Sequence, residues 1–213
     1  MSQGSDRPCE PSTVQRGRVD KYGVGEDPYT YPGSDVLRNR LGILDAGLLE
    51  AAERDFSRLA VLELPLAPPP YDFNYFCHLH KALFGEVYSW AGQIRTVDIA
   101  KGDSRFCNVN FVSKEASKLF SRLAQDNYLQ GLEQPAMAER LAEYYCDINV
   151  LHPFRDGNGR AQRLLFEHIT ASSGFNLNFA DVTQEEWVQA NIAGYYGQYA
   201  PMQQIMERAL HVL

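Results

Sequence analysis

The sequence predicts an all-α protein with one short β-hairpin. Apolar residues recur at spacings of three and four along most of the chain beyond residue 44. Only the stretch Arg95–Val112 alternates between apolar and polar residues as strands do. The 213 residues are 45% hydrophobic and 22% charged, so one chain of this size can bury a sizeable core.

The first half of the chain predicts a tail, an arm and two helices. Residues 1–20 mix Gly, Ser, Pro, Gln and Arg without periodicity, which indicates a disordered tail. Glycines, prolines and tyrosines in residues 21–44 indicate an irregular extended arm. Helical spacing follows over Asp45–Leu62 and Asp72–Phe84, and prolines between residues 65 and 70 separate the two helices.

The alternating stretch at residues 95–112 predicts the hairpin, and helices follow it. Arg95–Ala100 forms the first strand, a turn comes next, and Arg105–Val112 returns as the partner strand. The remaining helices are predicted at Ser113–Asn127, Pro135–Val150, the region up to residue 173, the region after the capping box Thr183–Glu186, and Pro201–Val212.

Composition excludes several classes of function. A formal net charge of −7 argues against broad binding to nucleic acid or to acidic membranes. No apolar run reaches the length of a membrane span, and the polar start is not a signal peptide. Cys9, Cys77, Cys107 and Cys146 lie far apart without a CxxC pair, which argues against a disulfide framework or a zinc site. We therefore expect a cytoplasmic protein.

The segment Leu151–Arg163 carries the candidate chemistry. It contains an imidazole, a carboxylate, a Gly-Asn-Gly turn and two arginines three residues apart, directly before a helical pattern. The first N–H groups of a helix attract anions, and glycines let a ligand approach the backbone closely. The segment therefore predicts a site for a nucleoside triphosphate.

Each polar side chain of this segment has a functional and an ordinary interpretation. His152 suits proton removal from a hydroxyl, although a lone histidine is usually structural. Asp156 suits Mg²⁺ beside phosphates, and it could also cap the helix. Arg160 and Arg163 suit phosphate binding, and surface ion pairs are their alternative. Arg155 is expected to face solvent or a target.

These residues alone leave the reaction open between phosphoryl and nucleotidyl transfer. The segment lacks the Lys-Ser/Thr ending of a Walker loop, and no strand followed by GxGxxG indicates a dinucleotide fold.

The segment His152–Arg163 resembles the Fic (filamentation induced by cAMP) family, because it matches the pattern HxFx(D/E)GNGRxxR at every specified position. The similarity extends through Asp27–Gly33, Arg38–Gly42 and Trp90–Arg95. These segments look most like the toxin component of bacterial Fic toxin–antitoxin pairs, the class I proteins inhibited in trans. The resemblance implies a single Fic domain over residues 21–213, a helical bundle with a β-hairpin flap over the active site.

The resemblance also implies a reaction, protein adenylylation, with ATP and Mg²⁺. His152 would deprotonate a Tyr, Ser or Thr hydroxyl of a target protein, and Asp156 would hold Mg²⁺ between the α- and β-phosphates. Arg160 would contact the phosphates, and Arg163 the γ-phosphate. The remaining residues implied for the nucleotide are Gly157, Asn158, Gly159, Ile99, Ala100 and Asn191. The residues implied for a flap that docks the target by strand addition are Val97, Asp98, Lys101, Gly102, Asp103 and Ser104.

Other readings of the same residues stay open. Doc-type kinases, related to this family, carry lysine in place of the second glycine, so Gly159 favours AMP transfer over phosphoryl transfer. Some members transfer other phosphate-containing groups, and the motif does not encode the base. A catalytically silent binding module, self-modification of a tyrosine and a surface role for Asn191 are further alternatives.

The absence of an inhibitory motif and the resemblance to the family lead to expectations about regulation and partners. None of the 14 glutamates is followed by Gly or Asn, so the inhibitory (S/T)xxxE(G/N) motif is absent from the chain. We expect a separate small antitoxin to supply the glutamate that pairs with Arg163. By resemblance alone, the expected target is a subunit of DNA gyrase or topoisomerase IV in the bacterial cytoplasm. Direct contact with nucleic acid or a membrane is not expected.

Overall fold

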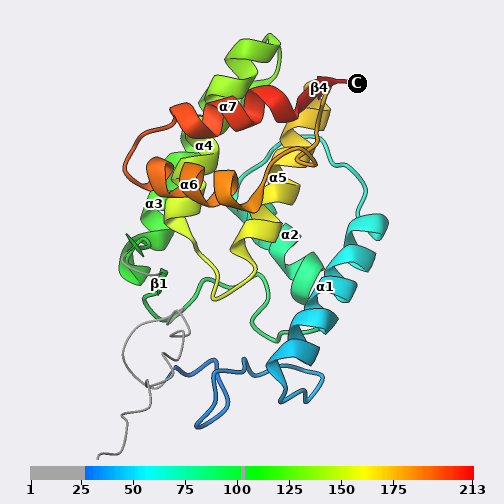
Figure 1. Ribbon diagram of the computed structural model, residues 1–213, viewed down its shortest axis with the longest axis vertical. Coiled ribbons are helices and arrows are strands. Elements are labelled where there is room, and N and C mark those ends of the chain that lie inside the picture. The colour runs from blue at the N-terminus through cyan, green and yellow to red at the C-terminus, as the bar shows by residue number, and fades with distance from the viewer. Residues whose placement is uncertain (1–26, 102–103) are drawn as a thin grey trace, which may run out of the picture.

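The computed structural model describes residues 27–101 and 104–213, and a central helix, α4, organises them (Figure 1). Helix α4 (Gln134–Leu151) packs against α3 (Val112–Gln125), α5 (Asn158–Ser172), α6 (Gln184–Tyr195) and α7 (Ala200–Ala209). Its buried residues lie on several sides of the helix, as expected for a helix inside a bundle. They are Met137, Ala138, Leu141, Ala142, Tyr144, Tyr145, Cys146, Ile148 and Leu151. The helical fold predicted from the sequence is confirmed.

The first two helices of the chain lie along one side of the bundle (Figure 1). Helix α1 (Ala46–Glu63) packs on α2 (Phe73–Phe84), and α2 packs on α5. An aspartate caps each N-terminus: Asp45 accepts a hydrogen bond from Leu48 N at 2.9 Å, and Asp72 accepts one from Tyr75 N at 2.7 Å. Both helices were predicted within one or two residues of their observed bounds.

The predicted hairpin exists but is much shorter than residues 95–112. Strand β1 (Ala100–Lys101) pairs antiparallel with β2 (Ser104–Arg105), and a 3-10 turn, η1 (Val109–Phe111), leads into α3. The prediction of long strands was wrong because side-chain hydrogen bonds, rather than backbone hydrogen bonds between strands, hold the chain on either side of the short hairpin. The Asp98 carboxylate accepts hydrogen bonds from Val109 N and Asn108 Nδ2, each at 2.7 Å.

A second small sheet was missed from the sequence. Strand β3 (Phe175–Leu177) pairs antiparallel with β4 (Leu210–Val212), so the predicted helix over residues 201–212 ends at Ala209 instead. Gly174, with φ +83°, ends the α5 region and turns the chain into β3. The sheet closes over the end of α5, because Leu213 N donates to Gly174 O at 2.9 Å.

The described part of the arm, residues 27–44, folds back on itself. Thr30 and Leu37 form an isolated antiparallel bridge, and Arg38 Nε donates to Thr30 O at 2.7 Å. The predicted tail at residues 1–20, the start of the arm, and the flap residues Gly102 and Asp103 lie outside the described residues. Among the residues described, no helix combines the length and the apolar character that crossing a membrane requires.

Candidate active site

His152 lies at the point where α4 ends. It adopts a left-handed conformation, φ 43° and ψ 61°, and Pro153 after it cannot continue the helix. His152 Nδ1 lies 3.0 Å from Asn149 O. A carbonyl oxygen only accepts hydrogen bonds, so Nδ1 carries the proton and Nε2 keeps a lone pair. This tautomer suits a general base, the role predicted for His152.

The ring of Phe106 covers the imidazole of His152. The two ring centroids are 3.7 Å apart and the planes are 13° from parallel, so the rings are stacked. Burial, the largest cause, lowers the pKa of His152 to about 4. The imidazole is therefore neutral near pH 7, and Phe106 restrains its orientation.

Gly157 and Asn158 determine the conformation of the loop after His152. Gly157 has φ +77°, and a Cβ there would lie 2.5 Å from Phe84 Cε2. The buried side chain of Asn158 accepts from Phe154 N at 2.8 Å and donates to Phe154 O at 2.7 Å. Asn158 therefore shapes the loop with its side chain, so its backbone N–H is the group that remains for the nucleotide contact predicted for it.

Gly159 differs from Gly157 because the protein does not require a glycine there. A Cβ added at Gly159 would meet no atom within 4 Å. Gly159 lies exposed in the first turn of α5, where backbone N–H groups have no acceptor inside the helix. The open space beside these N–H groups is the position expected for a phosphate.

Arg160 is held by a carboxylate and an aromatic ring outside the motif. Its guanidinium forms an ion pair with Glu53 of α1 and lies 4.4 Å from the centroid of the Phe84 ring. Glu53 is 8% exposed, and it also accepts a hydrogen bond from the hydroxyl of buried Tyr88. Because Glu53 has two partners, this buried carboxylate is compensated, and it fixes Arg160 at the start of α5.

Arg163 is held differently, over two aromatic rings and near the carboxyl group of Glu167 one turn later on α5. Its guanidinium carbon lies 5.4 Å from the centroid of Phe179 and 5.3 Å from that of Trp187. The side chain is on the exposed side of α5, and it lines the same groove as Arg160. A cation held by aromatic rings keeps its donors available to an anion.

Arg155 does not face solvent or a target, which corrects the prediction. It is 2% exposed, and its Nε donates to Asp27 Oδ2 at 2.8 Å, within an ion pair. Its guanidinium carbon lies 5.9 Å from the centroid of the Tyr29 ring. The prediction failed because the arm folds back over the motif loop, and Arg155 is the residue that fastens it there.

Two buried side chains from the preceding segments hold backbone carbonyls of the motif. Arg95, 1% exposed, donates through Nε to His152 O at 2.9 Å and through Nη1 to Val97 O at 2.6 Å. His80 Nε2 lies 2.9 Å from Asp156 O. Burial, as the largest cause, also lowers the pKa of His80 to about 4. The conformation of the motif thus depends on residues far from it in sequence.

The described residues of the predicted flap lie in the short hairpin and in the segment directly before it. Ile99 is buried and its carbonyl accepts from Phe106 N at 3.2 Å, so Ile99 anchors the hairpin. Exposed Lys101 lines the groove described below. The other described flap positions are Val97, half-buried, Asp98, exposed, and Ala100 and Ser104, half-buried. Their contacts with a nucleotide or a target stay predictions.

Asn191, predicted as a contact to adenine or ribose, lies on α6. Its Nδ2 donates to Trp187 O at 2.7 Å, one turn earlier on the same helix. The side-chain oxygen of Asn191 is the group that remains for a ligand. This arrangement is compatible with both the nucleotide contact and the surface amide, so the prediction remains untested.

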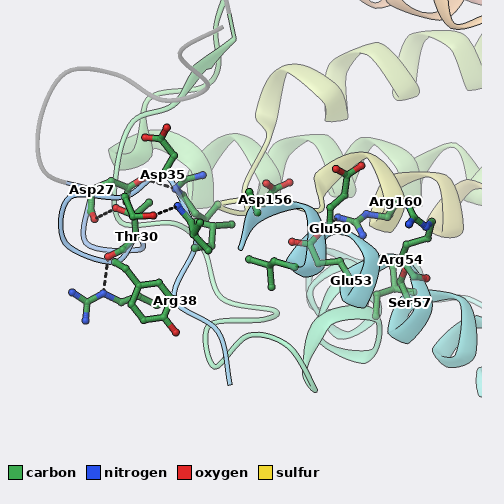
Figure 2. A pocket seen from close by; sticks show the side chains of 18 of the residues that line it. Asp27, Thr30, Asp35, Arg38, Glu50, Glu53, Arg54, Ser57, Asp156 and Arg160 are labelled. Carbon is green, nitrogen blue, oxygen red and sulfur yellow. Dashed lines mark hydrogen bonds and ion pairs between the residues drawn. The ribbon is translucent and has the colours of Figure 1, made fainter. Parts of the chain in front are cut away.

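A groove of about 1910 Å³ runs between the arm and α1 and reaches the motif. Figure 2 shows Asp27 and Thr30 of the arm on one side and Glu50 and Glu53 of α1 on the other, with Asp156 between them in this view. Arg160, Arg163 and Lys101 also line it. The volume of the groove is sufficient for a polyphosphate or a peptide, and its lining combines cationic side chains with carboxylates.

The donor set of the site fits Mg²⁺ held together with a substrate. Within residues 27–101 and 104–213, no group of three or more His, Cys, Asp or Glu side chains could hold a metal by itself. Mg²⁺ commonly takes one or two carboxylates and completes its shell with waters and substrate phosphates. Asp156 lines the groove together with Arg160 and Arg163, and its Oδ1 accepts from Gly157 N at 2.6 Å.

Sequence reasoning missed the supporting residues, though some left a signal. Glu53 falls in the buried stripe of α1 with Leu49 and Ser57, and a carboxylate in such a stripe requires a partner. His80 falls in the buried stripe of α2 in the same way. Phe106 left no signal, because only the fold places it against His152.

The chain is similar in sequence to known proteins of one family. The sequence model of the Fic/DOC family matches residues 70–170. A probable protein adenylyltransferase Fic of Salmonella typhimurium is 42% identical over 191 residues, which are 90% of this chain and 96% of that protein. The protein adenylyltransferase VbhT of Bartonella schoenbuchensis is 35% identical over 192 residues, which are 89% of this chain and 40% of VbhT.

Solved structures show the same fold. The crystal structure of the BepC protein of Bartonella tribocorum, a VirB-translocated effector with bound AMPPNP, matches with a TM-score of 0.79 and 28% identity. The match covers 87% of this chain and 97% of that chain. Together with the relatives, the helical fold and the site define an enzyme of the nucleotidyltransferase class. The chain belongs to the Fic/DOC family.

Proposed function

We propose that this enzyme transfers AMP from ATP to a hydroxyl side chain of a target protein. One observation carries the proposal: His152, at the end of α4, keeps a lone pair on Nε2, and α5, whose first N–H groups can bind an anion, begins six residues later at Asn158. A base and an anion site so placed can activate a hydroxyl next to a phosphate. Relatives named protein adenylyltransferases support the same reaction. The proposal treats residues 21–213 as one Fic domain.

The proposed mechanism is a single displacement at the α-phosphorus. His152 Nε2 takes the proton from the target hydroxyl, and the oxygen forms a bond to the α-phosphorus. The bond from that phosphorus to the bridging oxygen of the β-phosphate breaks, and pyrophosphate leaves. Arg160, Arg163 and the N–H groups at the start of α5 stabilise the negative charge of the phosphates.

The proposed metal is Mg²⁺, and the Asp156 carboxylate is the residue that would hold it together with the bound nucleotide. When bound, Mg²⁺ neutralises phosphate charge and helps to orient the α-phosphate. The Asp156 carboxylate lines the groove, and its hydrogen bond from Gly157 N fixes its direction. Asp156 thereby places the positive charge beside the anion site.

The space at Gly159 supports nucleotidyl over phosphoryl transfer. Because a Cβ built there meets no atom within 4 Å outside its own helical turn in the part of the chain that the structure describes, this position is open to the nucleotide. A long cationic side chain at this position, as the Doc-type resemblance describes, would fill the space and place a charge on the phosphates. The glycine leaves the α-phosphate free to approach the first turn of α5.

A separate antitoxin is the proposed regulator, and the groove between the arm and α1 supports it. Arg163 lines the groove, is exposed, and lies over the rings of Phe179 and Trp187. A glutamate supplied by a small protein in the groove could pair with Arg163 and displace the γ-phosphate. By resemblance, we propose a toxin of the bacterial cytoplasm with a DNA gyrase or topoisomerase IV subunit as its target.

Labelled ATP tests the reaction. The purified chain is incubated with Mg²⁺, bacterial lysate and ATP labelled at the α- or the γ-phosphate, and His152→Ala is the control. We expect protein to acquire label from the α-position only, and only with the wild-type chain. Label from the γ-position would identify a kinase, and labelling by neither would indicate a silent binding module.

A further inference from the structure

His80 of α2 is a buried imidazole that the proposed reaction does not use directly. It is 0% exposed, and its ring is stacked on the Phe154 ring of the motif loop, with centroids 3.8 Å apart. Packing alone would suit a phenyl ring in this position. Instead, both ring nitrogens have backbone partners: Nε2 lies 2.9 Å from Asp156 O, and Nδ1 lies 2.9 Å from Gly92 N.

The two partners fix the protonation of the ring. Gly92 N–H can only donate, so Nδ1 must hold a lone pair, whereas Asp156 O can only accept, so Nε2 must carry the hydrogen. Only the neutral Nε2–H tautomer satisfies both bonds. Gly92 can approach this closely because it is a glycine at φ +77°, where a Cβ would lie 2.8 Å from Cys77 O.

The bond from His80 is one of two that hold a single peptide group. The carbonyl of the Asp156–Gly157 peptide accepts from His80, and the N–H of the same peptide donates to the Asp156 carboxylate at 2.6 Å. A peptide group is planar, so fixing its oxygen and its N–H fixes the plane. That plane sets the direction of the Asp156 carboxylate and of the next N–H groups, which begin α5.

We propose that His80 is a positioning residue for nucleotide binding, a neutral hydrogen-bond donor that locks the Asp156–Gly157 peptide in the orientation that faces the phosphates. This inference rests on the proposed function of the same site. Residues outside the motif then belong to the phosphate site. The N–H of Gly92 requires an unprotonated Nδ1 in His80, and the proton on Nε2 is therefore available for the hydrogen bond to Asp156 O. The side chain touches neither substrate nor metal.

Two variants separate positioning from packing. His80→Gln places an amide N–H₂ near the position of Nε2 and loses the acceptor for Gly92, while His80→Asn places an oxygen near Nδ1 and loses the donor to Asp156. Each loses one bond, so both should lose similar thermal stability. The probe is α,β-methylene-ATP with Mg²⁺, in which the bond that would break is blocked, and calorimetry measures its Kd.

We expect His80→Asn to bind the probe about tenfold more weakly than the wild type and His80→Gln to lose roughly threefold or less. The exposed His78 on the same helix supplies the control, His78→Asn, with no change in Kd. Equal losses in the two His80 variants, or no loss in His80→Asn, would overturn the proposal.

Nuclear magnetic resonance of ¹⁵N-histidine in the wild-type chain tests the tautomer without any variant that must fold. The His80 signal should be that of the neutral Nε2–H form, and a Nδ1–H or charged form would overturn the proposal. Failure of the proposed function looks different, because the wild type itself would then fail to bind the probe or to transfer AMP.

Discussion

The two glycines of the motif have different surroundings in the structure and therefore different roles. Gly157 has a positive φ and the Phe84 ring beside it, whereas Gly159 has open space. The first glycine is required for the loop to form, and the second leaves open space where we propose that the phosphates bind. Alanine at each position separates folding from binding.

We expect Gly157→Ala to cost at least about 2 kcal/mol and to lower Tm by roughly 4–8 °C, because of left-handed strain and the clash with Phe84. Gly159→Ala should leave Tm unchanged but reduce AMP transfer, since the methyl group enters the proposed phosphate space. Differential scanning calorimetry and the labelled-ATP assay measure the two effects. A large drop in Tm for Gly159→Ala would contradict this assignment.

Glu53 has a measurable consequence through Arg160. Glu53→Ala removes the carboxylate that holds Arg160 and accepts from Tyr88, so kcat/KM for ATP should fall about tenfold. Glu50→Ala, an exposed carboxylate lining the same groove, controls for the change in charge. An increase in activity for Glu53→Ala would mean that Glu53 restrains Arg160 rather than presenting it.

The pH dependence of the reaction should reflect His152. A base is active only when unprotonated, so kcat/KM rises with pH through the pKa of His152 and is level above it. Burial lowers that pKa to about 4, so the acid limb should lie near pH 4 rather than near 6.5. Phe106→Ala exposes the ring, and its acid limb should shift toward 6.5. A wild-type limb near 6.5 would show that the ring is solvated during the reaction.

At the scale of elements, the sequence predicts what local chemistry determines. Helix starts were predictable because their caps are local: Asp45, Asp72 and the Thr183–Glu186 box each bond within three residues. The hairpin was predicted too long because Asp98 bonds Val109 and Asn108 across ten or eleven residues. Sheet β3–β4 was missed because its strands lie more than thirty residues apart along the chain.

The same Asp98 contacts predict how the flap works. Asp98→Ala frees the base of the hairpin, so KM for a protein target should rise about tenfold, while the Kd of the nucleotide stays constant. Glu115→Ala, which removes a half-buried carboxylate in the first turn of α3 that pairs with Lys118, is the control. If the Kd of the nucleotide rises as much as the KM of the target, the flap serves the nucleotide instead.

At the scale of the whole molecule, buried histidines make stability depend on pH. Burial lowers the pKa values of His80 and His152 to about 4, and that of His168 also falls. Between about pH 6.5 and 4 the unfolded chain binds more protons than the folded chain, so stability is fully present above 6.5 and is lost as pH falls. We expect the free energy of unfolding in urea to decrease over this window.

Replacing one buried histidine checks that expectation. His80→Gln should have a shallower pH dependence between 6.5 and 4 than the wild type, because it cannot take up a proton on unfolding. His78→Gln, at an exposed position of the same helix, should keep the wild-type slope. Identical slopes for all three chains would assign the pH dependence to other groups.

In the candidate site too, the sequence predicts residues of one continuous segment but not the contacts made from distant segments. The sequence predicts the imidazole, the carboxylate, the glycines and the arginines because they fall in one continuous segment. It does not predict their supports, Glu53, His80, Arg95 and Phe106, because each contacts the motif from a segment 46 to 107 residues away. Arg155 was misplaced for the same reason, since the arm that buries it begins far upstream.

The hydrogen bonds from His80 and Arg95 to carbonyl oxygens of the motif have a consequence for protein engineering. A designer who grafted residues 151–163 onto another pair of helices would transplant the reactive groups without the frame that aims them. His80 and Arg95, which hold the carbonyls of Asp156 and His152, would have to travel with the graft, together with Gly92, which selects the tautomer of His80. The smallest portable unit of this chemistry is therefore a set of interlocking segments and not a peptide.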